Sequence, residues 1–345
     1  MLKNTNFWNG RNVLITGISG FIGSNLAKKL TSAGANVVGI ERSKAKTSLL
    51  YFNEIDRKIR IESGNICDLQ FMKSVFVDHN IQNCFHLAAQ VEVGVAAKLP
   101  YLTWETNIRG TYTVLEAIRE SGILVDSIIV ASSDKSYGEY PENKMPYKED
   151  YPLIPKFPYD VSKACSDMIA QSYTSDLYQF PLCVTRFSNI YGPGQLNFSA
   201  LIPDCIRSAL GYSDFIPRGD GSQKRDYIFV EDVCDLYMTM SGSLSLEKKH
   251  FGEIYNAGSN HPRSVKEVVE KVFTLMNQKP KLDEILKLMS KKQTKGEIKC
   301  QYMDSEKVGR DFDWQPSTSF EDGLSKTIEW FSKYLSWRNG ARFED

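Results

Sequence analysis

Residues 12–23 of this 345-residue chain read NVLITGISGFIG, and this stretch decides the fold. Its first five residues form a short β-rich run, and a glycine turn from Gly17 to Gly23 follows directly. Apolar residues then recur at helical spacing until Gly34, a residue type that commonly ends a helix. A strand, a glycine turn and a helix in this order predict a dinucleotide-binding site, with an ordinary tight turn as the alternative.

The glycine turn explains how such a site would work. Gly17, Gly20 and Gly23 let the backbone approach a pyrophosphate at the amino end of the helix, where the dipole and free N–H groups favour anions. Phe21 and Ile22 belong to the same turn. A second strand ends at Glu41, near the spacing expected for the acid that accepts from adenosine ribose hydroxyls. Glu41 favours NAD, whereas the neighbouring Arg42 could hold a 2′-phosphate and keeps NADP as the less favoured alternative.

Strand and helix patterns alternate from residue 12 to residue 190, which predicts an α/β fold with a doubly wound parallel sheet of the Rossmann type. Further strands are expected at 37–40, 59–62, 84–89, 128–131 and 182–186. We predict a Rossmann domain over residues 1–190, to which 226–257 return. Residues 191–225 and 258–337 are expected to form a smaller α/β substrate lobe, and 338–345 a tail.

Several finer features are also expected. A long helical region should cover about residues 100–121 and contain Asn107, and the last helix should run from 319 to 334, before a loose tail. Leu87, Ala88 and Ala89 follow a strand, and their small size would let a cofactor lie close to the backbone. His86, just before them, is expected to be a satisfied core histidine.

Composition excludes several classes of function. The chain has 42 basic and 42 acidic residues, so its formal net charge of zero argues against attraction to nucleic acid or an anionic membrane. No apolar run reaches transmembrane length, and the polar residues 1–10 lead straight into a strand, so a cytoplasmic protein without a secretory signal is expected. Seven scattered cysteines are read as reduced thiols, and four histidines without ligand spacing predict no metal site.

A second informative stretch runs from Ser132 to Lys163. Tyr159 and Lys163 lie one helical turn apart, so their side chains share a face. A lysine ammonium there would lower the pKa of the tyrosine, whose ordinary value is about 10, and Ser133 could hold a substrate oxygen against the phenol. A Tyr-x-x-x-Lys spacing alone is more often a surface pair, but the upstream dinucleotide turn favours the catalytic interpretation.

Together with the glycine turn, these residues make the chain resemble the extended short-chain dehydrogenase/reductase family. The resemblance covers nearly the whole chain, and its motifs are typical of enzymes that act on nucleotide-linked sugars. They are HLAAQ at 86–90, TNIRGT at 106–111, RFSNIYGP at 186–193 and RDYIFVED at 225–232.

The resemblance implies residue roles. Ser133, Tyr159 and Lys163 would be catalytic, and Asn189 and Arg225 would hold the diphosphate of the sugar nucleotide. The cofactor set would comprise Gly17, Gly20, Phe21, Ile22, Gly23, Glu41, Arg42, Asn65, Ile66, Leu87, Ala88, Ala89, Asn107, Tyr159 and Lys163. Asn65–Ile66 match an adenine-contacting pair in which Asn replaces Asp and loses its charge. A homodimer through the helices near 100–121 and 160–178 is also expected.

The two residues after Ser133 indicate which reaction within this family is expected. Asp134–Lys135 resembles nucleotide-sugar 4,6-dehydratases, in particular the CDP-glucose type and related enzymes that act on UDP-sugars. Epimerases usually carry small or apolar residues there. The implied reaction oxidises the sugar at C4, removes water across C5 and C6, and returns hydride to C6, with Asp134 protonating the departing hydroxyl. Lys135 is either the C5 base or a cation that stabilises the enolate. An epimerase and a non-catalytic nucleotide-sensing module are the competing functions.

Overall fold

A computed structural model describes residues 6–293 and 298–340 of the chain. Its centre is a seven-stranded sheet in the order β10-β6-β5-β4-β1-β2-β3, and every neighbouring pair is parallel. The strands are β1 (Asn12–Thr16), β2 (Asn36–Glu41), β3 (Arg60–Ser63), β4 (Asn83–His86), β5 (Ser127–Ala131), β6 (Leu182–Phe187) and β10 (Ile254–Ala257). The predicted doubly wound sheet is confirmed.

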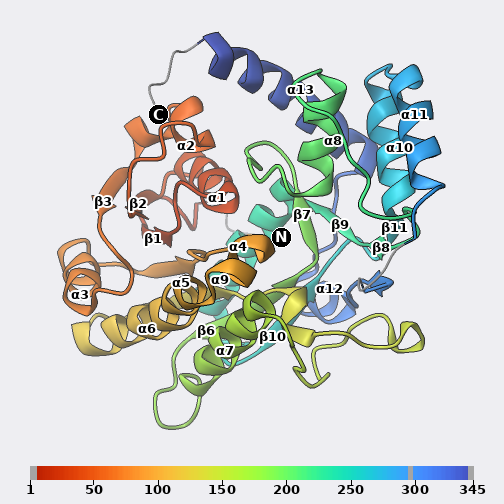
Figure 1. Ribbon diagram of the computed structural model, residues 1–345. Coiled ribbons are helices and arrows are strands. Elements are labelled where there is room, and N and C mark those ends of the chain that lie inside the picture. Colours follow the sequence, from red (N-terminus) through yellow and green to blue (C-terminus); the bar gives the residue numbers. More distant parts are fainter. Residues whose placement is uncertain (1–5, 294–297, 341–345) are drawn as a thin grey trace.

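Helices cover both faces of this sheet (Figure 1). One face packs on α1 (Phe21–Ser32) and α9 (Val230–Glu247), and the other on α3 (Leu69–Asp78), α6 (Gly110–Ser121) and α7 (Pro158–Ser172). Successive strand residues point to opposite faces, so Ile129 joins the first core while Ile128 and Val130 join the second. Continuous apolar runs such as residues 128–130 are therefore what a sheet covered on both faces requires.

A third core lies among helices gathered on the side of the molecule away from β3 (Figure 1). These are α8 (Leu201–Ala209), α10 (Val265–Leu275), α11 (Lys279–Met289) and α13 (Phe320–Gly340). Two small sheets accompany them, one of β7 (Asn189–Tyr191) and β9 (Tyr227–Phe229), the other of β8 (Lys224–Arg225), β11 (Arg263–Ser264) and β12 (Cys300–Gln301). The exact domain boundaries stay a prediction.

Short elements complete the described chain. They are α2 (Leu49–Phe52), η1 (Ile55–Lys58), α4 (Val93–Lys98), η3 (Asp134–Tyr137), η4 (Glu142–Lys144) and α12 (Glu306–Phe312). Two helices begin at side-chain caps. Asp68 caps α3 by accepting from the backbone N–H groups of Gln70 and Phe71, and Ser264 forms a complete capping box with Glu267 at α10.

The helical region expected over residues 100–121 is confirmed. It consists of α5 (Pro100–Trp104), a π-helical turn η2 (Glu105–Arg109) and α6 in direct succession. The expected loose tail is helical as far as Gly340, because α13 continues and the Trp337 ring packs 5.0 Å from the ring of Phe52. Residues 341–345 lie outside the described part of the chain.

Three further observations concern the described residues alone. None of the helices within 6–293 and 298–340 has the length and apolar character needed to cross a bilayer. All seven cysteines are free, and five of them are buried. The same part of the chain contains no group of three or more His, Cys, Asp or Glu side chains arranged to hold a metal ion.

Candidate active site

The candidate site lies at the carboxyl edge of the sheet, where the strand order reverses between β1 and β4. Ligands of open α/β sheets bind at such a switch point. The turn after β1 and the turn after β4 come very close there, since a Cβ atom on Gly17 would lie 2.8 Å from the Ala88 Cα. Gly17 also has φ +73°, so both space and backbone conformation require glycine.

The glycine turn fits a dinucleotide. Gly20 is the N-cap of α1, whose first turn contains no acidic residue that would repel a phosphate. A Cβ on Gly23 would lie 2.3 Å from the Gly17 carbonyl oxygen, so Gly23 is what lets the helix start against the turn. These positions form the cradle that a pyrophosphate at a helix amino terminus needs.

Glu41 stands at the end of β2, as expected, and it is buried. Its carboxylate accepts from the Ala45 backbone N–H at 2.8 Å and from the Tyr51 hydroxyl, which orders the following loop. A carboxylate has about four acceptor sites, so these two bonds leave capacity for a ribose hydroxyl. Arg42 is exposed beside it.

Of the two residues predicted to contact adenine, Asn65 is exposed and Ile66 is buried. The Asn65 side-chain oxygen accepts from the Cys67 backbone N–H at 3.0 Å. Ile66 also explains the glycine at position 110, since a Cβ there would lie 2.4 Å from the end of the isoleucine side chain.

His86 is a satisfied core histidine, as predicted. Its Nδ1 lies 2.9 Å from the Thr16 hydroxyl and its Nε2 lies 3.0 Å from the Thr111 hydroxyl. Burial lowers the pKa of His86 to about 3, so the ring is neutral at physiological pH. Thr16 in turn accepts from the backbone N–H groups of Leu87 and Ala88, which fixes the turn that approaches Gly17.

Asn107 supports the site from the π-helical turn. Its side chain exchanges hydrogen bonds with the backbone of Gln90, accepting at 2.7 Å and donating at 3.0 Å. It also donates to the Ser162 hydroxyl on α7 at 2.8 Å. Asn107 thus joins the turn after β4 to the helix that carries Tyr159, and these bonds accompany the π-helical turn within the expected helical region.

Ser133, Asp134 and Tyr159 come together at the end of β5. The Ser133 hydroxyl donates to Asp134 Oδ1 at 3.1 Å, and Ser133 lies close enough to Tyr159 to lower the pKa of its phenol. Asp134 is buried, and its Oδ2 has no hydrogen-bond partner among the described residues. Burial raises the pKa of Asp134, which favours the protonated acid.

The predicted lowering of the Tyr159 pKa by Lys163 is wrong for the unliganded chain. Burial raises the pKa of Tyr159, and only Ser133 acts in the other direction. The Lys163 amine donates to the Ala131 carbonyl oxygen at 2.7 Å, and burial lowers the pKa of Lys163 to about 8. Desolvation of both side chains therefore outweighs the attraction that the one-turn spacing indicated.

Two residues at this site were missed by sequence reasoning. Gln301 accepts from the Lys135 amine at 2.6 Å, and Asp160 is buried beside Tyr159 with its pKa raised to about 6 by burial. The charge of Lys135 lowers the pKa of both Asp134 and Asp160. Asp160 lies within the stretch from Ser132 to Lys163, where a carboxyl in the first turn of a buried helix was a usable signal. Gln301 had none, because it comes from a two-residue strand.

The two predicted substrate residues line one cavity of about 240 Å³. Asn189 reaches it from β7 and Arg225 from β8, and the Asn189 side chain donates to the Asp226 carbonyl oxygen at 3.2 Å. The charge of Arg225 also lowers the pKa of Asp134, so the cavity lies near the segment Ser133–Lys135.

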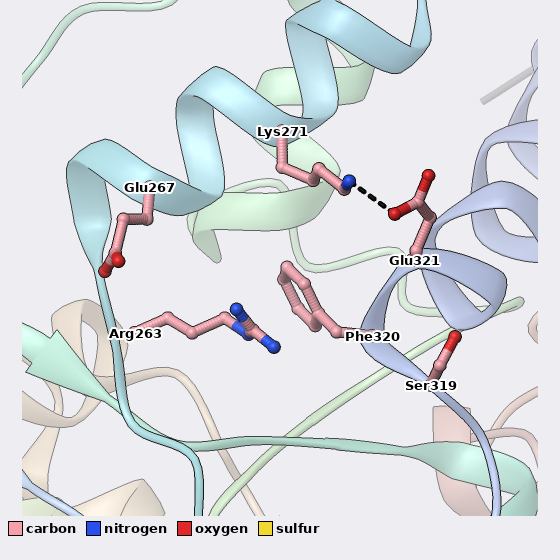
Figure 2. A pocket seen from close by; sticks show the side chains of 6 residues that line it. All are labelled: Arg263, Glu267, Lys271, Ser319, Phe320 and Glu321. Atoms are coloured by element: carbon pink, nitrogen blue, oxygen red, sulfur yellow. Dashed lines mark hydrogen bonds and ion pairs between the residues drawn. The ribbon is translucent and has the colours of Figure 1, made fainter.

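A separate cavity of about 390 Å³ lies between α10 and α13 (Figure 2). Its charged groups have partners within the chain, since Lys271 pairs with Glu321 and Arg263 lies 4.6 Å from the centre of the Phe320 ring. None of the predicted site residues lines it. It is therefore distinct from the candidate active site.

Comparison with known proteins gives the family. The GDP-mannose 4,6 dehydratase family matches residues 14–327. This chain belongs to that family. The match confirms the resemblance to extended short-chain dehydrogenase/reductases and spans both the dinucleotide turn and the residues that line the cavity at Asn189.

Curated family members are similar over nearly their whole length. dTDP-glucose 4,6-dehydratase 1 of Escherichia coli K12 is 30% identical, with 96% of this chain and 95% of the relative covered. dTDP-D-glucose 4,6-dehydratase of Mus musculus is 29% identical, with 96% and 92% covered.

Solved structures of two enzyme classes resemble the fold almost equally. dTDP-glucose 4,6-dehydratase from Bacillus anthracis in complex with NAD is 29% identical, with a TM-score of 0.81 and coverage of 95% of this chain and 98% of that chain. UDP-glucose 4-epimerase from Thermotoga maritima with UDP-glucose is 28% identical, with a TM-score of 0.78 and coverage of 94% and 99%. Within the family, side chains rather than the fold must separate the two reactions.

Proposed function

We propose that this protein is an NAD-dependent nucleotide-sugar 4,6-dehydratase, a hydro-lyase that converts an NDP-hexose to the NDP-4-keto-6-deoxyhexose. The observation that carries this proposal is Asp134. It is a buried carboxyl with a raised pKa and an unpartnered oxygen, adjoining Ser133 and Tyr159. A buried acid whose pKa is raised suits protonation of a departing hydroxyl, which a 4-epimerase does not need.

The positions of the site residues suggest a role for each of them. NAD, when bound, supplies the hydride acceptor for oxidation at C4 and the donor for reduction at C6. Ser133 holds the C4 oxygen, and Tyr159 accepts the proton of the C4 hydroxyl. That role requires the pKa of Tyr159 to fall on ligand binding, and we assign this effect to Lys163. The 4-ketone makes the C5 proton acidic, a base removes it, and Asp134 protonates the C6 hydroxyl, which leaves as water.

The cofactor assignment has two supports. Glu41 stands where an adenosine ribose hydroxyl is expected, and the Bacillus anthracis dehydratase was solved with NAD. The proposed contacts are those of the glycine turn, Glu41, Asn65, Ile66 and the turn after β4. We propose Asn189 and Arg225 for the diphosphate, because both line the cavity next to the catalytic loop.

The nucleotide is to be found by experiment. The Mus musculus and Escherichia coli relatives are dTDP-glucose 4,6-dehydratases, whereas Asp134–Lys135 resembles the CDP-glucose type. The test is a panel of UDP-, CDP-, GDP- and dTDP-glucose with mass spectrometry of the products. A product lighter by one water supports the proposal, and a product of unchanged mass supports the epimerase.

We also propose a homodimer in the cytoplasm. The dimer is supported by a group of large apolar side chains that are exposed on α5, α6 and α7. Both α5 and α6 contact α7. Tyr101 is 72% exposed, Met168 62%, Trp104 43% and Tyr112 41%. Exposed patches of this kind mark interaction surfaces. Sedimentation of the wild type and of Tyr101→Asp tests the dimer, since the variant should sediment as a monomer.

A further inference from the structure

The side chain of Gln301 joins the catalytic loop to the small sheet of the substrate lobe. Its Oε1 accepts from the Lys135 amine at 2.6 Å, and its Nε2 donates to the Asp134 carbonyl oxygen at 3.3 Å. Gln301 is fully buried, although 166 residues separate it from Lys135. One side chain therefore contacts both residues that distinguish the catalytic loop from that of an epimerase.

The orientation of this amide is determined by its partners. A flipped Gln301 would place N–H donors against the Lys135 amine and an acceptor against the Asp134 carbonyl oxygen. Because Gln301 is buried, either mismatch would leave a buried polar group unsatisfied, which is unfavourable. The amide therefore helps to hold the Lys135 amine in place.

Gln301 is also in register with Arg225 across the parallel pair of β12 and β8. Side chains in register lie on the same face of a sheet, so the residue that holds Lys135 neighbours the residue proposed for the diphosphate. The same small sheet thus carries Arg225, proposed to bind the diphosphate, and Gln301, which holds Lys135.

We propose that Gln301 is a positioning residue for the dehydration step, which holds the Lys135 amine at the reacting C5–C6 edge of the sugar. This inference rests on the proposed function. In that step the C5 proton passes to a base, the proton of Asp134 passes to the C6 hydroxyl, and water leaves. The lysine stem is long and flexible, and the carboxyls of Asp134 and Asp160 both attract its charge. Without Gln301 the amine moves toward them and away from the sugar.

The test separates two halves of the reaction. Gln301→Met keeps the length of the side chain and removes both hydrogen bonds. With NAD and the preferred NDP-glucose, we expect reduced nicotinamide to form at the wild-type rate, because Ser133 and Tyr159 are untouched. Loss of water should slow about 10²-fold, since displacement of a catalytic group by about 1 Å can have that effect. Reduced nicotinamide should accumulate, and KM should change less than about twofold.

Two more variants make the outcome specific. Gln301→Glu keeps an acceptor for the Lys135 amine and should recover part of the rate lost in Gln301→Met. Cys300→Ala changes the neighbouring buried residue on the same strand and should leave the ratio of the two rates unchanged.

Several results would overturn the proposal. Equal slowing of both half-reactions in Gln301→Met, with Gln301→Glu no better, would make Gln301 a structural residue only. Wild-type dehydration in Gln301→Met would exclude any role. If the wild type itself never releases water, the proposed function fails, and that result is distinct from a defect confined to the variants.

Discussion

Arg186 on β6 and Asp167 on α7 form a buried, two-point ion pair. The Arg186 Nε donates to Asp167 Oδ2 at 2.7 Å and the Nη2 donates to Oδ1 at 3.0 Å. Their side chains are only 3% and 0% exposed. Because α7 also carries Tyr159 and Lys163, this pair holds the helix of the proposed catalytic residues against the sheet.

Removing one partner should leave a buried charge unpaired. We expect Arg186→Met to lower the free energy of unfolding by about 3–5 kcal/mol, as measured by urea denaturation. The double variant Arg186→Met/Asp167→Leu is the control, and it should lose less than the single variant because no charge remains buried. A double variant that loses the sum of both single effects would contradict this account.

The phenol of Tyr159 is proposed to accept the proton of the C4 hydroxyl. Tyr159→Phe should reduce turnover about 10²–10⁴-fold, the usual contribution of a general base. The thermal midpoint should hardly change, since the ring is retained. Tyr212→Phe, at a tyrosine that is 44% exposed, is the matched control and should keep full activity. Comparable loss of activity in both variants would remove the special role of Tyr159.

Asp134 is proposed to act after oxidation at C4. Asp134→Asn has nearly the same shape but no acidic proton, so water loss should fall about 10²–10⁴-fold while oxidation proceeds. Absorbance of reduced nicotinamide during a single turnover measures this directly, and it should rise and persist. Should the absorbance instead never rise in the variant, Asp134 acts in oxidation and its assignment as the acid is wrong.

Asp160 predicts a dependence of stability on pH. Burial raises its pKa from 3.8 to about 6, so between these values the folded chain keeps a proton that the unfolded chain releases. The contribution of Asp160 to stability therefore decreases as the pH rises through this window. Asp160→Asn removes this effect, so the variant should gain stability relative to wild type between about pH 4 and pH 7. Urea denaturation at both pH values measures the gain, and parallel pH profiles would refute it.

Local sequence signals predicted the features that depend on neighbouring residues. The strand, the glycine turn and the helix at 12–32 follow from apolar spacing and from the backbone freedom of Gly17. The cap at Asp68 and the capping box at Ser264 needed only the next turn of the helix. The alternation of apolar strands and helices was enough for the doubly wound sheet.

Features set by tertiary contacts could not be predicted in this way. The raised pKa of Tyr159 depends on burial, which a one-turn spacing does not reveal. The π-helical turn contains Asn107, whose side chain is bonded to the backbone of Gln90 and to Ser162 on another helix. Gln301 approaches Lys135 only because β12 pairs with β8. Each of these requires the folded arrangement of segments that lie far apart in sequence.

The most direct test of the central claim is the reaction of the wild-type protein with NAD and its preferred NDP-glucose in deuterium oxide, followed by mass spectrometry and NMR of the product. Dehydration through a C5 proton predicts a 4-keto-6-deoxy product that has lost one water and carries solvent deuterium at C5. A product of unchanged composition, or one that has lost water without deuterium at C5, would contradict the account.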